Sequence, residues 1–277
     1  MKIALYNRDP GDGVEALKGR LREKGATLAC YGEDFFSWED LPAGTELFLS
    51  LGGDGTFLQS LTFIRDCGIP VAGVNFGRLG FLATARADEG DRWIDDLLSG
   101  RYTVEERSLL RVSCTGLPDD FYPFALNEVS VQRRGASMLS VHVRIDGREL
   151  PTYWADGLVV STPTGSTAYN LSVGGPVVMP SSEVMVIAPI APHNLNVRPL
   201  VVPIGAAVEL TFHSRERDAL LTLDNRSCAL PSGTTVGLQR GRYGLRYVSL
   251  SDNNFIGALR TKLFWGEDRR NSNRQEP

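Results

Sequence analysis

A short acidic turn from Gly52 to Thr56, with the sequence GGDGT, is the first place in this chain where chemistry could occur. Glycines let backbone amides approach a phosphate without an intervening side chain, whereas the carboxylate of Asp54 would repel one. Asp54 therefore has another role. It could accept a proton from an attacking hydroxyl, hold a metal ion, or cap the helix that follows.

The neighbouring residues predict that this turn joins a strand to a helix. The apolar run Leu47–Leu51 is typical of a buried strand, and residues 56–67 have a helical pattern. Open α/β sheets bind ligands at the C-terminal ends of such strands, where helix amides favour anions. We therefore predict that the backbone at the turn binds phosphate, at Gly52, Gly53, Gly55 and Thr56.

Residues 1–101 alternate predicted strands and helices, which indicates an α/β domain with a doubly wound, mostly parallel sheet. A second glycine turn follows the predicted strand 69–75, and we add its Gly77 and Arg78 to the phosphate-binding residues. The predicted strands are 2–7, 27–31, 47–51 and 69–75, and the predicted helices are 14–24, 56–67 and 88–98.

The first strand–helix junction also contains Gly11, Gly13 and Ala16, which match the dinucleotide-binding pattern GxGxxA. Two acidic residues, Glu33 and Asp34, follow at about the expected distance. The loop itself is long and acidic where a pyrophosphate would bind. We therefore favour a plain strand–turn–helix here over a Rossmann nucleotide site.

Residues 102–251 differ, because many short segments of alternating polarity are separated by Gly, Pro, Asn or Asp. This spacing predicts an all-β sandwich domain. Residues 253–264 are helical in pattern, and the segment 252–277 is expected to return to the first domain as a C-terminal helix and polar tail.

Two polar segments of the predicted sandwich do not resemble ordinary strand sequence. Asn127 and Glu128 are adjacent polar residues within a predicted strand, so one of them should face the interior or a cleft unless the strand lies at an edge. Residues 156–176 are rich in glycine and hydroxyl side chains, which suit hydrogen bonds to ribose or phosphate but also occur in ordinary loops.

Composition excludes several classes of protein. The net charge of −4 over 277 residues argues against a nucleic-acid binder, and no apolar run is long enough for a membrane helix. The four cysteines have no paired spacing, so we expect free thiols in the cytoplasm. Only three histidines occur, and no GxxxxGK[ST] motif of a P-loop enzyme is present.

Taken together, these segments resemble the ATP-dependent NAD kinase family. The resemblance extends in order over residues 2–265. Its motifs are GGDGT at 52–56, GVNFGRLGFL at 73–82, Asn127–Glu128, the segment from Asp156–Gly157 through Tyr169 to Gly174-Gly175-Pro176, Pro192-His193-Asn194, and Arg198-Pro199-Leu200.

The resemblance implies an active site between the two domains. It also implies transfer of the γ-phosphoryl group of ATP to the 2′-hydroxyl of the adenosine ribose of NAD, with a divalent metal, usually magnesium, and a homo-oligomer, either a dimer or a tetramer. Asp54 matches the proton acceptor, and Asp54 and Gly55 would contact substrate. Further matches to substrate-binding positions are Asn127, Glu128, Asp156, Thr167, Ala168, Tyr169, Asn170, Leu171 and Ser172. The metal ligands are not assigned.

Three residues depart from the family pattern. Ala155 replaces a common glycine, Trp154 replaces a polar or basic residue, and Arg226 stands where a glutamine contacts substrate elsewhere. Two rival functions remain at this stage. One is a GGDGT-type kinase acting on a lipid or other hydroxyl acceptor, and the other is a dinucleotide-binding regulatory protein without activity.

Overall fold

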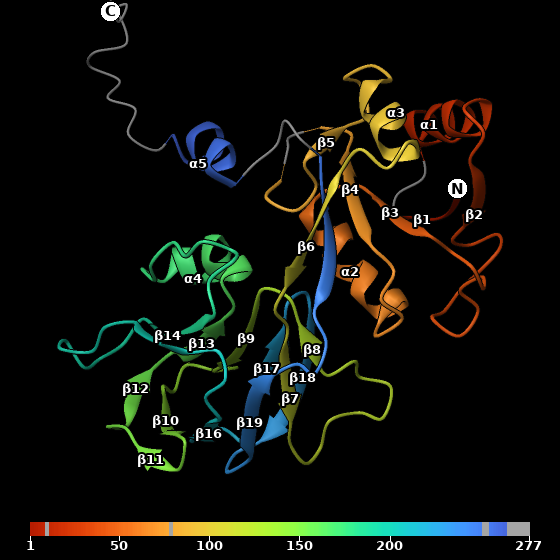
Figure 1. The fold of residues 1–277 in the computed structure, drawn as a ribbon. Helices are drawn as coiled ribbons and strands as arrows, with labels where there is room; N and C mark the ends of the chain where they lie inside the picture. The colour runs from red at the N-terminus through yellow and green to blue at the C-terminus, as the bar shows by residue number, and fades with distance from the viewer. Residues whose placement is uncertain (9–10, 78–79, 251–254, 265–277) are drawn as a thin grey trace, which may run out of the picture.

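The computed structural model describes residues 1–8, 11–77, 80–250 and 255–264. The chain forms an N-terminal α/β domain and a C-terminal domain that is mostly β, followed by a C-terminal helix (Figure 1). The predicted fold class is therefore confirmed. Within the described residues, no helix combines the length and the apolar character needed to cross a bilayer.

The first domain is built around a seven-stranded sheet whose main order is β2-β1-β3-β4-β20-β6. Its pairings are parallel except for β20 with β6. The strands are β1 (Lys2–Asn7), β2 (Thr27–Cys30), β3 (Leu47–Leu51), β4 (Val71–Asn75), β5 (Ala85–Arg86), β6 (Thr103–Arg107) and β20 (Leu245–Ser249). The helices are α1 (Asp12–Glu23), α2 (Asp54–Ile64) and α3 (Arg92–Leu98).

Helices cover both faces of this sheet, because its central strands are buried on both sides. Leu47–Leu51 and Val71–Asn75 have no exposed residue. One face packs against α1 and α3 and the other against α2, as Figure 1 shows. Three layers of this kind place the C-terminal ends of β1, β3 and β4 along one edge, where the strand–helix turns meet.

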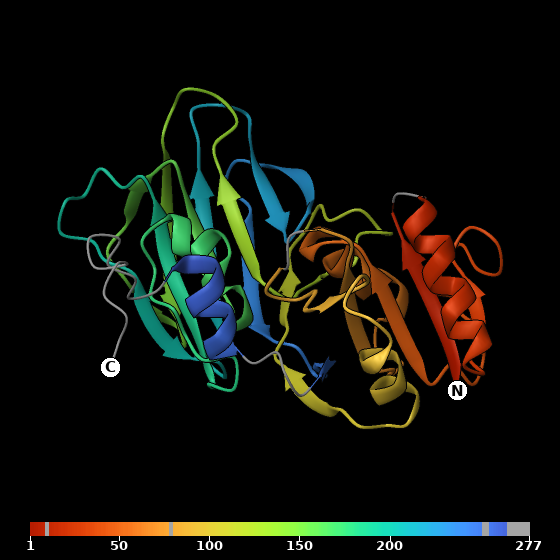
Figure 2. The same ribbon diagram turned by 90° about the horizontal axis from the view of Figure 1, so that it is seen from above.

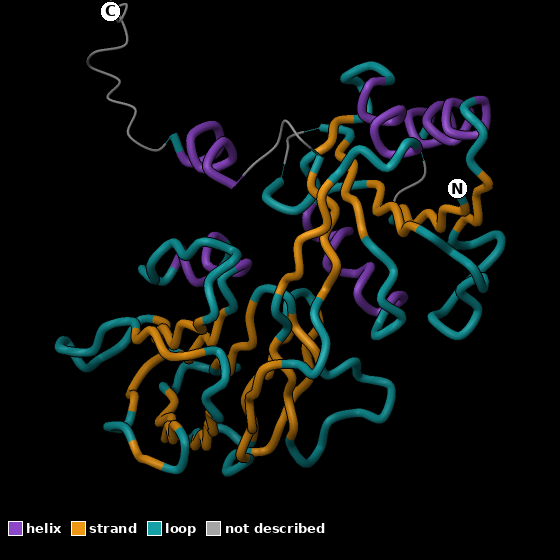
Figure 3. Tube along the Cα trace, viewed as in Figure 1, coloured by secondary structure: helices purple, strands orange, loops and turns teal. Residues whose placement is uncertain are grey.

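The second domain is a sandwich of two antiparallel sheets with an apolar core between them. The first contains β7 (Leu110–Ser113), β8 (Phe124–Ala125), β10 (Leu139–Ile145), β11 (Arg148–Glu149), β12 (Tyr153–Ala155), β16 (Val208–His213) and β19 (Thr235–Arg240). The second contains β9 (Glu128–Gln132), β13 (Gly157–Ser161), β14 (Val184–Ile190), β15 (Leu200–Pro203), β17 (Asp218–Leu223) and β18 (Arg226–Pro231). Figure 2 shows the sandwich beside the first domain, and Figure 3 shows how few helices it carries.

Sheet membership corrects the domain limits expected from the sequence. The expected sandwich, residues 102–251, includes β6 and β20, but both strands pair within the first sheet. The chain therefore completes the first sheet only after it has built the sandwich. The alternating pattern of these strands could not reveal this, because pattern predicts a strand and not its partner.

The C-terminal helix α5 (Phe255–Leu263) contacts the first domain at Phe81. The ring of Phe255 lies 6.3 Å from that of Phe81, in the loop after β4. On its other side α5 borders the second domain at the 3-10 helix η1 (Thr164–Thr167), close to α4 (Tyr169–Ser172), as Figures 1 and 2 show. The expected polar tail at 265–277 lies outside the described residues.

Candidate active site

The site is built first from the GGDGT turn at the end of β3. Gly52 has a φ of 150°, and a side chain there would overlap Thr56, so this turn requires glycine. The N-cap residue of α2 is Gly53, so no side chain caps this helix. The helix begins at Asp54, two residues earlier than its sequence pattern predicts. The amides of Thr56 and Phe57 already donate to the carbonyl of Gly53, at 3.0 and 3.1 Å, and that of Gly52 donates to Val74 at 2.8 Å. The amides of Gly53, Asp54 and Gly55 remain, at the positive end of the helix, to bind an anion.

The Asp54 carboxylate is held by the loop after β4 rather than by its own helix. Its Oδ2 accepts the N–H of Phe81 at 2.7 Å, and its Oδ1 accepts those of Leu82 and Ala83, each at 3.0 Å. Asp54 is thus not an N-cap, and that alternative is wrong. Three donors suit an ionised carboxylate and fix its orientation.

Gly80 and Tyr247 make this arrangement possible. A β-carbon at Gly80 would overlap the Asp54 carboxylate, so only glycine lets the loop approach it. The hydroxyl of Tyr247, on β20, donates to the carbonyl of Leu82 at 3.1 Å. Tyr247 was not predicted as a site residue, since nothing in its local sequence distinguishes it from a core tyrosine.

A cavity of about 490 Å³ lies beside the GGDGT turn, at the C-terminal ends of β1, β3 and β4. Gly52, Gly53 and Thr56, all predicted phosphate-binding residues, line it. The wall opposite includes Gly11 and Gly13, so the glycines of the discounted dinucleotide pattern do face the cavity. The other lining residues are Val14, Leu51, Asn75 and Phe76.

The second predicted turn is only partly described. The N–H of Gly77 donates to Oδ1 of Asn75 at 2.7 Å, which turns the chain at the end of β4. Arg78, predicted to bind phosphate, lies outside the described residues.

Asn127 and Glu128 lie where the backbone leaves its strand. β8 ends at Ala125 and β9 begins at Glu128, and β9 is flanked by β13 and β17, so the edge-strand alternative is wrong. The amides of residues 126–128 donate instead to the carboxylate of Asp224, which has no exposed side-chain surface. Asp224 therefore shapes this corner from the turn between β17 and β18.

Glu128 has an unusual electrostatic environment. Burial, and secondarily the charge of Asp224, raises its pKa from 4.5 to about 8, although the N–H of Tyr169 opposes the rise. Its Oε2 is buried and has no hydrogen-bond partner among the described residues. A protonated Glu128 can donate a hydrogen bond at neutral pH, which a sugar or base oxygen or nitrogen could accept.

The predicted substrate-binding run at 167–172 adjoins both parts of the site. Thr167 lines a small cavity of about 30 Å³ together with Phe81 and α5, and Tyr169 bonds to Glu128. Asn170 is different, because it is fully buried and donates to the carbonyls of Ser166 and Pro176. In this structure Asn170 holds the loop together. Ala168 and Leu171 are half-buried, and Ser172 is exposed.

Two of the residues expected near the nicotinamide end, Asp156 and Arg226, already have hydrogen-bond partners within the protein. Asp156 forms a two-pronged ion pair with Arg133, at 2.7 and 3.1 Å. Trp154 is half exposed. The guanidinium of Arg226 donates to the carbonyls of Tyr122 and Phe124 and faces Asp224 at 3.7 Å, so it supports the backbone here.

One hydrogen bond in this region links the two domains at the site. The side-chain amide of Asn225 donates to the carbonyl of Gly55 at 3.3 Å. The same hairpin turn carries Asp224, so it touches both the GGDGT turn and the Asn127–Glu128 corner. Sequence reasoning missed this role, because the contact joins residues 170 positions apart.

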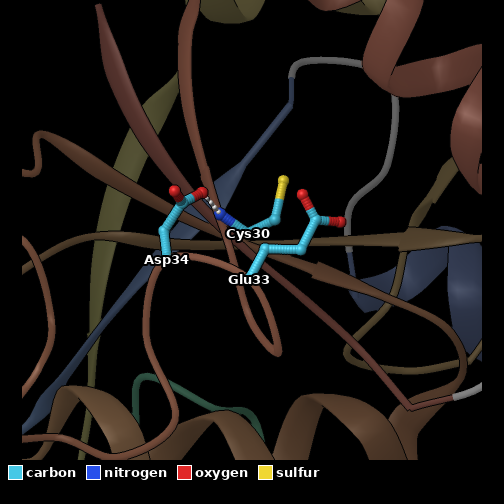
Figure 4. A group of neighbouring side chains, drawn as sticks. All are labelled: Cys30, Glu33 and Asp34. Atoms are coloured by element: carbon cyan, nitrogen blue, oxygen red, sulfur yellow. Dashed lines mark hydrogen bonds between the residues drawn. The ribbon is translucent and has the colours of Figure 1, made fainter.

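One group with metal-ligating side chains occurs in the described residues, at Cys30, Glu33 and Asp34 (Figure 4). The carboxylates of this cluster have partners within the protein. Glu33 pairs with Lys18 at 3.2 Å, Asp34 accepts the N–H of Cys30 at 2.7 Å, and burial raises the pKa of the Cys30 thiol. This cluster stabilises the turn after β2. Both acidic side chains of the discounted dinucleotide pattern therefore have partners within the protein.

Comparison with known proteins identifies the family whose sequences this chain matches. Residues 38–102 match the ATP-NAD kinase N-terminal domain and residues 126–250 the ATP-NAD kinase C-terminal domain. An NAD kinase of Porphyromonas gingivalis is 45% identical over 285 residues, which cover 96% of this chain and 98% of the relative. An NAD kinase of Flavobacterium psychrophilum is 40% identical over 242 residues, covering 86% and 82%.

Solved structures agree with these matches. An NAD kinase from Archaeoglobus fulgidus in complex with ATP superposes with a TM-score of 0.76 at 28% identity, over 94% of this chain and 99% of the other. Yeast NADH kinase complexed with NADH shares the fold, with a TM-score of 0.85 at 23% identity over 96% and 88%. The fold and site thus define a phosphotransferase of the kinase class. More narrowly, the chain belongs to the ATP-NAD kinase family.

Proposed function

We propose that this enzyme transfers the γ-phosphoryl group of ATP to the 2′-hydroxyl of the adenosine ribose of NAD, with Asp54 as proton acceptor. The observation that carries the proposal is the Asp54 carboxylate, which three amides of residues 81–83 hold beside an amide-rich turn and a 490 Å³ cavity. A binding protein would have no need of a fixed carboxylate beside phosphates.

The two sides of Asp54 suit different substrates. The cavity lined by Gly52, Gly53 and Thr56 lies at the N-terminus of α2, whose positive end and Gly53 amide suit the donor phosphates. The opposite side leads to Thr167 and, through Tyr169, to Glu128, whose polar groups suit an adenosine ribose better than a lipid. This arrangement favours NAD over the lipid acceptor of the rival proposal.

Among the described residues that line the cavity, none carries a carboxylate, so a magnesium ion would be held mainly by the phosphates of the donor, with Asp54 on the adjoining turn. Magnesium commonly binds one or two carboxylates together with substrate phosphates and water, and Asp54 is the carboxylate of the GGDGT turn. When bound, the metal would neutralise charge on the phosphates. The chain's own contribution is to orient the hydroxyl, accept its proton at Asp54 and present amides to the phosphates.

The first test is activity. The purified protein should form NADP from NAD and ATP and should not phosphorylate a panel of lipid alcohols. Asp54→Asn should lower turnover at least about a hundredfold, the scale of a lost general base, while NAD binding changes little. An asparagine can keep the bonds at Oδ1 and lose only the bond from Phe81, so the fold should survive at a cost of about 1–3 kcal/mol.

Asp66→Asn is the matched control, since Asp66 is exposed beyond the end of α2 and pairs only loosely with Arg242 at 3.6 Å. It should keep full turnover. Undiminished turnover in Asp54→Asn would remove Asp54 from the mechanism.

A further inference from the structure

A lysine from the C-terminal helix lies at the same corner as Asp54. The Nζ of Lys262 sits 4.8 Å from the centroid of the Phe81 ring. The N–H of Phe81 in turn donates to Asp54 at 2.7 Å. The ammonium group and the carboxylate therefore contact the ring and the backbone of one residue. The helix that supplies Lys262 reaches this corner from the far end of the chain.

Lys262 differs from the other three lysines of the chain. Lys2 donates to the carbonyl of Ala43, Lys18 pairs with Glu15 and Glu33, and Lys24 pairs with Asp91 and Asp95. Among the described residues, Lys262 has no carboxylate within 4.0 Å. Burial lowers the pKa of Lys262, and the charge of Asp54 opposes that effect.

A half-buried cation whose close partner among the described residues is a ring face suits an anion that arrives with the substrate. The reaction brings such an anion here. The ribose hydroxyl that loses its proton to Asp54 gains the phosphoryl group, so negative charge must come to lie next to a carboxylate that repels it. A cation beside the Phe81 ring would offset that repulsion.

We propose, on the basis of the function proposed above, that Lys262 contacts the transferred phosphoryl group and is a second catalytic residue. Asp54 accepts the hydroxyl proton, the ribose oxygen forms a bond to the γ-phosphorus, and the bond from that phosphorus to the bridging oxygen breaks to release ADP. Lys262 transfers no proton. It stabilises charge on the phosphoryl oxygens during transfer and on the 2′-phosphate of the product.

Three variants test this role. Lys262→Met removes the charge at similar length, and Lys262→Arg keeps the charge. Lys24→Met is the control, because Lys24 is the C-cap residue of α1 and pairs with Asp91 and Asp95. For each, kcat and KM are measured with NAD and ATP, and the affinities for NAD and NADP are measured by calorimetry without turnover. Lys262→Met should lower kcat and NADP affinity at least about tenfold, the scale of one charge-assisted hydrogen bond, and leave NAD affinity unchanged. Lys262→Arg should recover most of both losses.

Two outcomes would overturn the assignment. In one, Lys262→Met keeps wild-type kcat and NADP affinity. In the other, NAD and NADP affinities fall equally and arginine does not restore them, which means that Lys262 only anchors α5. Because the binding measurements need no turnover, they test the role of Lys262 independently of the proposed reaction. A wild-type protein that makes no NADP would count against the reaction itself.

Discussion

Two carboxylates at this site have opposite environments, and each environment suits a different task. Asp54 receives three backbone N–H donors and sits where a hydroxyl could lose its proton. Glu128 is half-buried near Asp224, its Oε2 is buried without a hydrogen-bond partner among the described residues, and its pKa is raised. Glu128 is therefore able to donate a hydrogen bond at neutral pH, whereas both oxygens of Asp54 already accept hydrogen bonds.

Glu128 should make the stability of the protein depend on pH. Its pKa is higher in the folded protein than in the unfolded chain, so its favourable contribution is complete below about pH 4.5 and is lost as the pH rises through about 8. Glu128→Gln should remove this loss. At pH 8.5 the wild type should have lost on the order of 2–4 kcal/mol more than the variant, relative to pH 5, at 1.36 kcal/mol per pKa unit.

Urea unfolding at the two pH values measures this difference. Glu149→Gln, at an exposed position on β11, is the control and should leave the pH dependence unchanged. An identical slope for wild type and Glu128→Gln would show that the carboxyl is ionised in the folded protein at neutral pH.

At the scale of elements, the loop between β4 and β5 determines the position of the Asp54 carboxylate in the turn after β3. The loop supplies three amides to Asp54, is anchored by Tyr247 and presents the Phe81 ring to α5. The close approach of loop and turn requires a glycine at position 80.

Gly80→Ala should therefore reduce activity sharply, because the new methyl group would displace the Asp54 carboxylate or the loop that holds it. We expect kcat to fall at least about thirtyfold and the free energy of unfolding to fall by about 1–3 kcal/mol, the range for overpacking. Steady-state kinetics and urea unfolding measure both. Gly19→Ala, in α1 with open space around it, should keep activity and stabilise the protein by up to about 1 kcal/mol. Equal activity in the two variants would contradict the packing argument.

At the scale of the whole molecule, the second domain is inserted between two strands of the first sheet. β6 leads into the sandwich and β20 leads out of it, and the two pair with each other. The apolar cluster around α2 also includes Phe124 and Leu126 of the second domain. The two domains are therefore joined through the paired strands β6 and β20 and share one apolar cluster.

This topology predicts different fates for two fragments. Residues 1–101 lack β20, the neighbour of β4, and should remain unfolded or aggregate because the cluster that includes Phe57 and Val71 loses Tyr247. Residues 108–244 keep every strand of both sandwich sheets and should fold. Circular dichroism and amide dispersion in NMR spectra distinguish these results. A cooperatively folded fragment 1–101 would contradict the sharing of the core.

The sequence by itself determined the kinds of element and the candidate chemistry. The runs Leu47–Leu51 and 69–75 predicted strands, and the glycines around Asp54 predicted a phosphate-binding turn, because both signals are local in the chain. The strands are present, and phosphate binding stays a prediction. The family motifs predicted a two-domain kinase, and family membership is confirmed. The individual substrate contacts stay predictions.

Only the tertiary structure decided which elements meet. It paired β6 with β20, brought the amides of residues 81–83 to Asp54, and set Asn225 against Gly55 and Lys262 against Phe81. These contacts join residues far apart in the chain, and their energy depends on burial and geometry that no local pattern encodes. For the same reason the raised pKa of Glu128 could not be read from its neighbours in sequence, because burial and the distant Asp224 cause it.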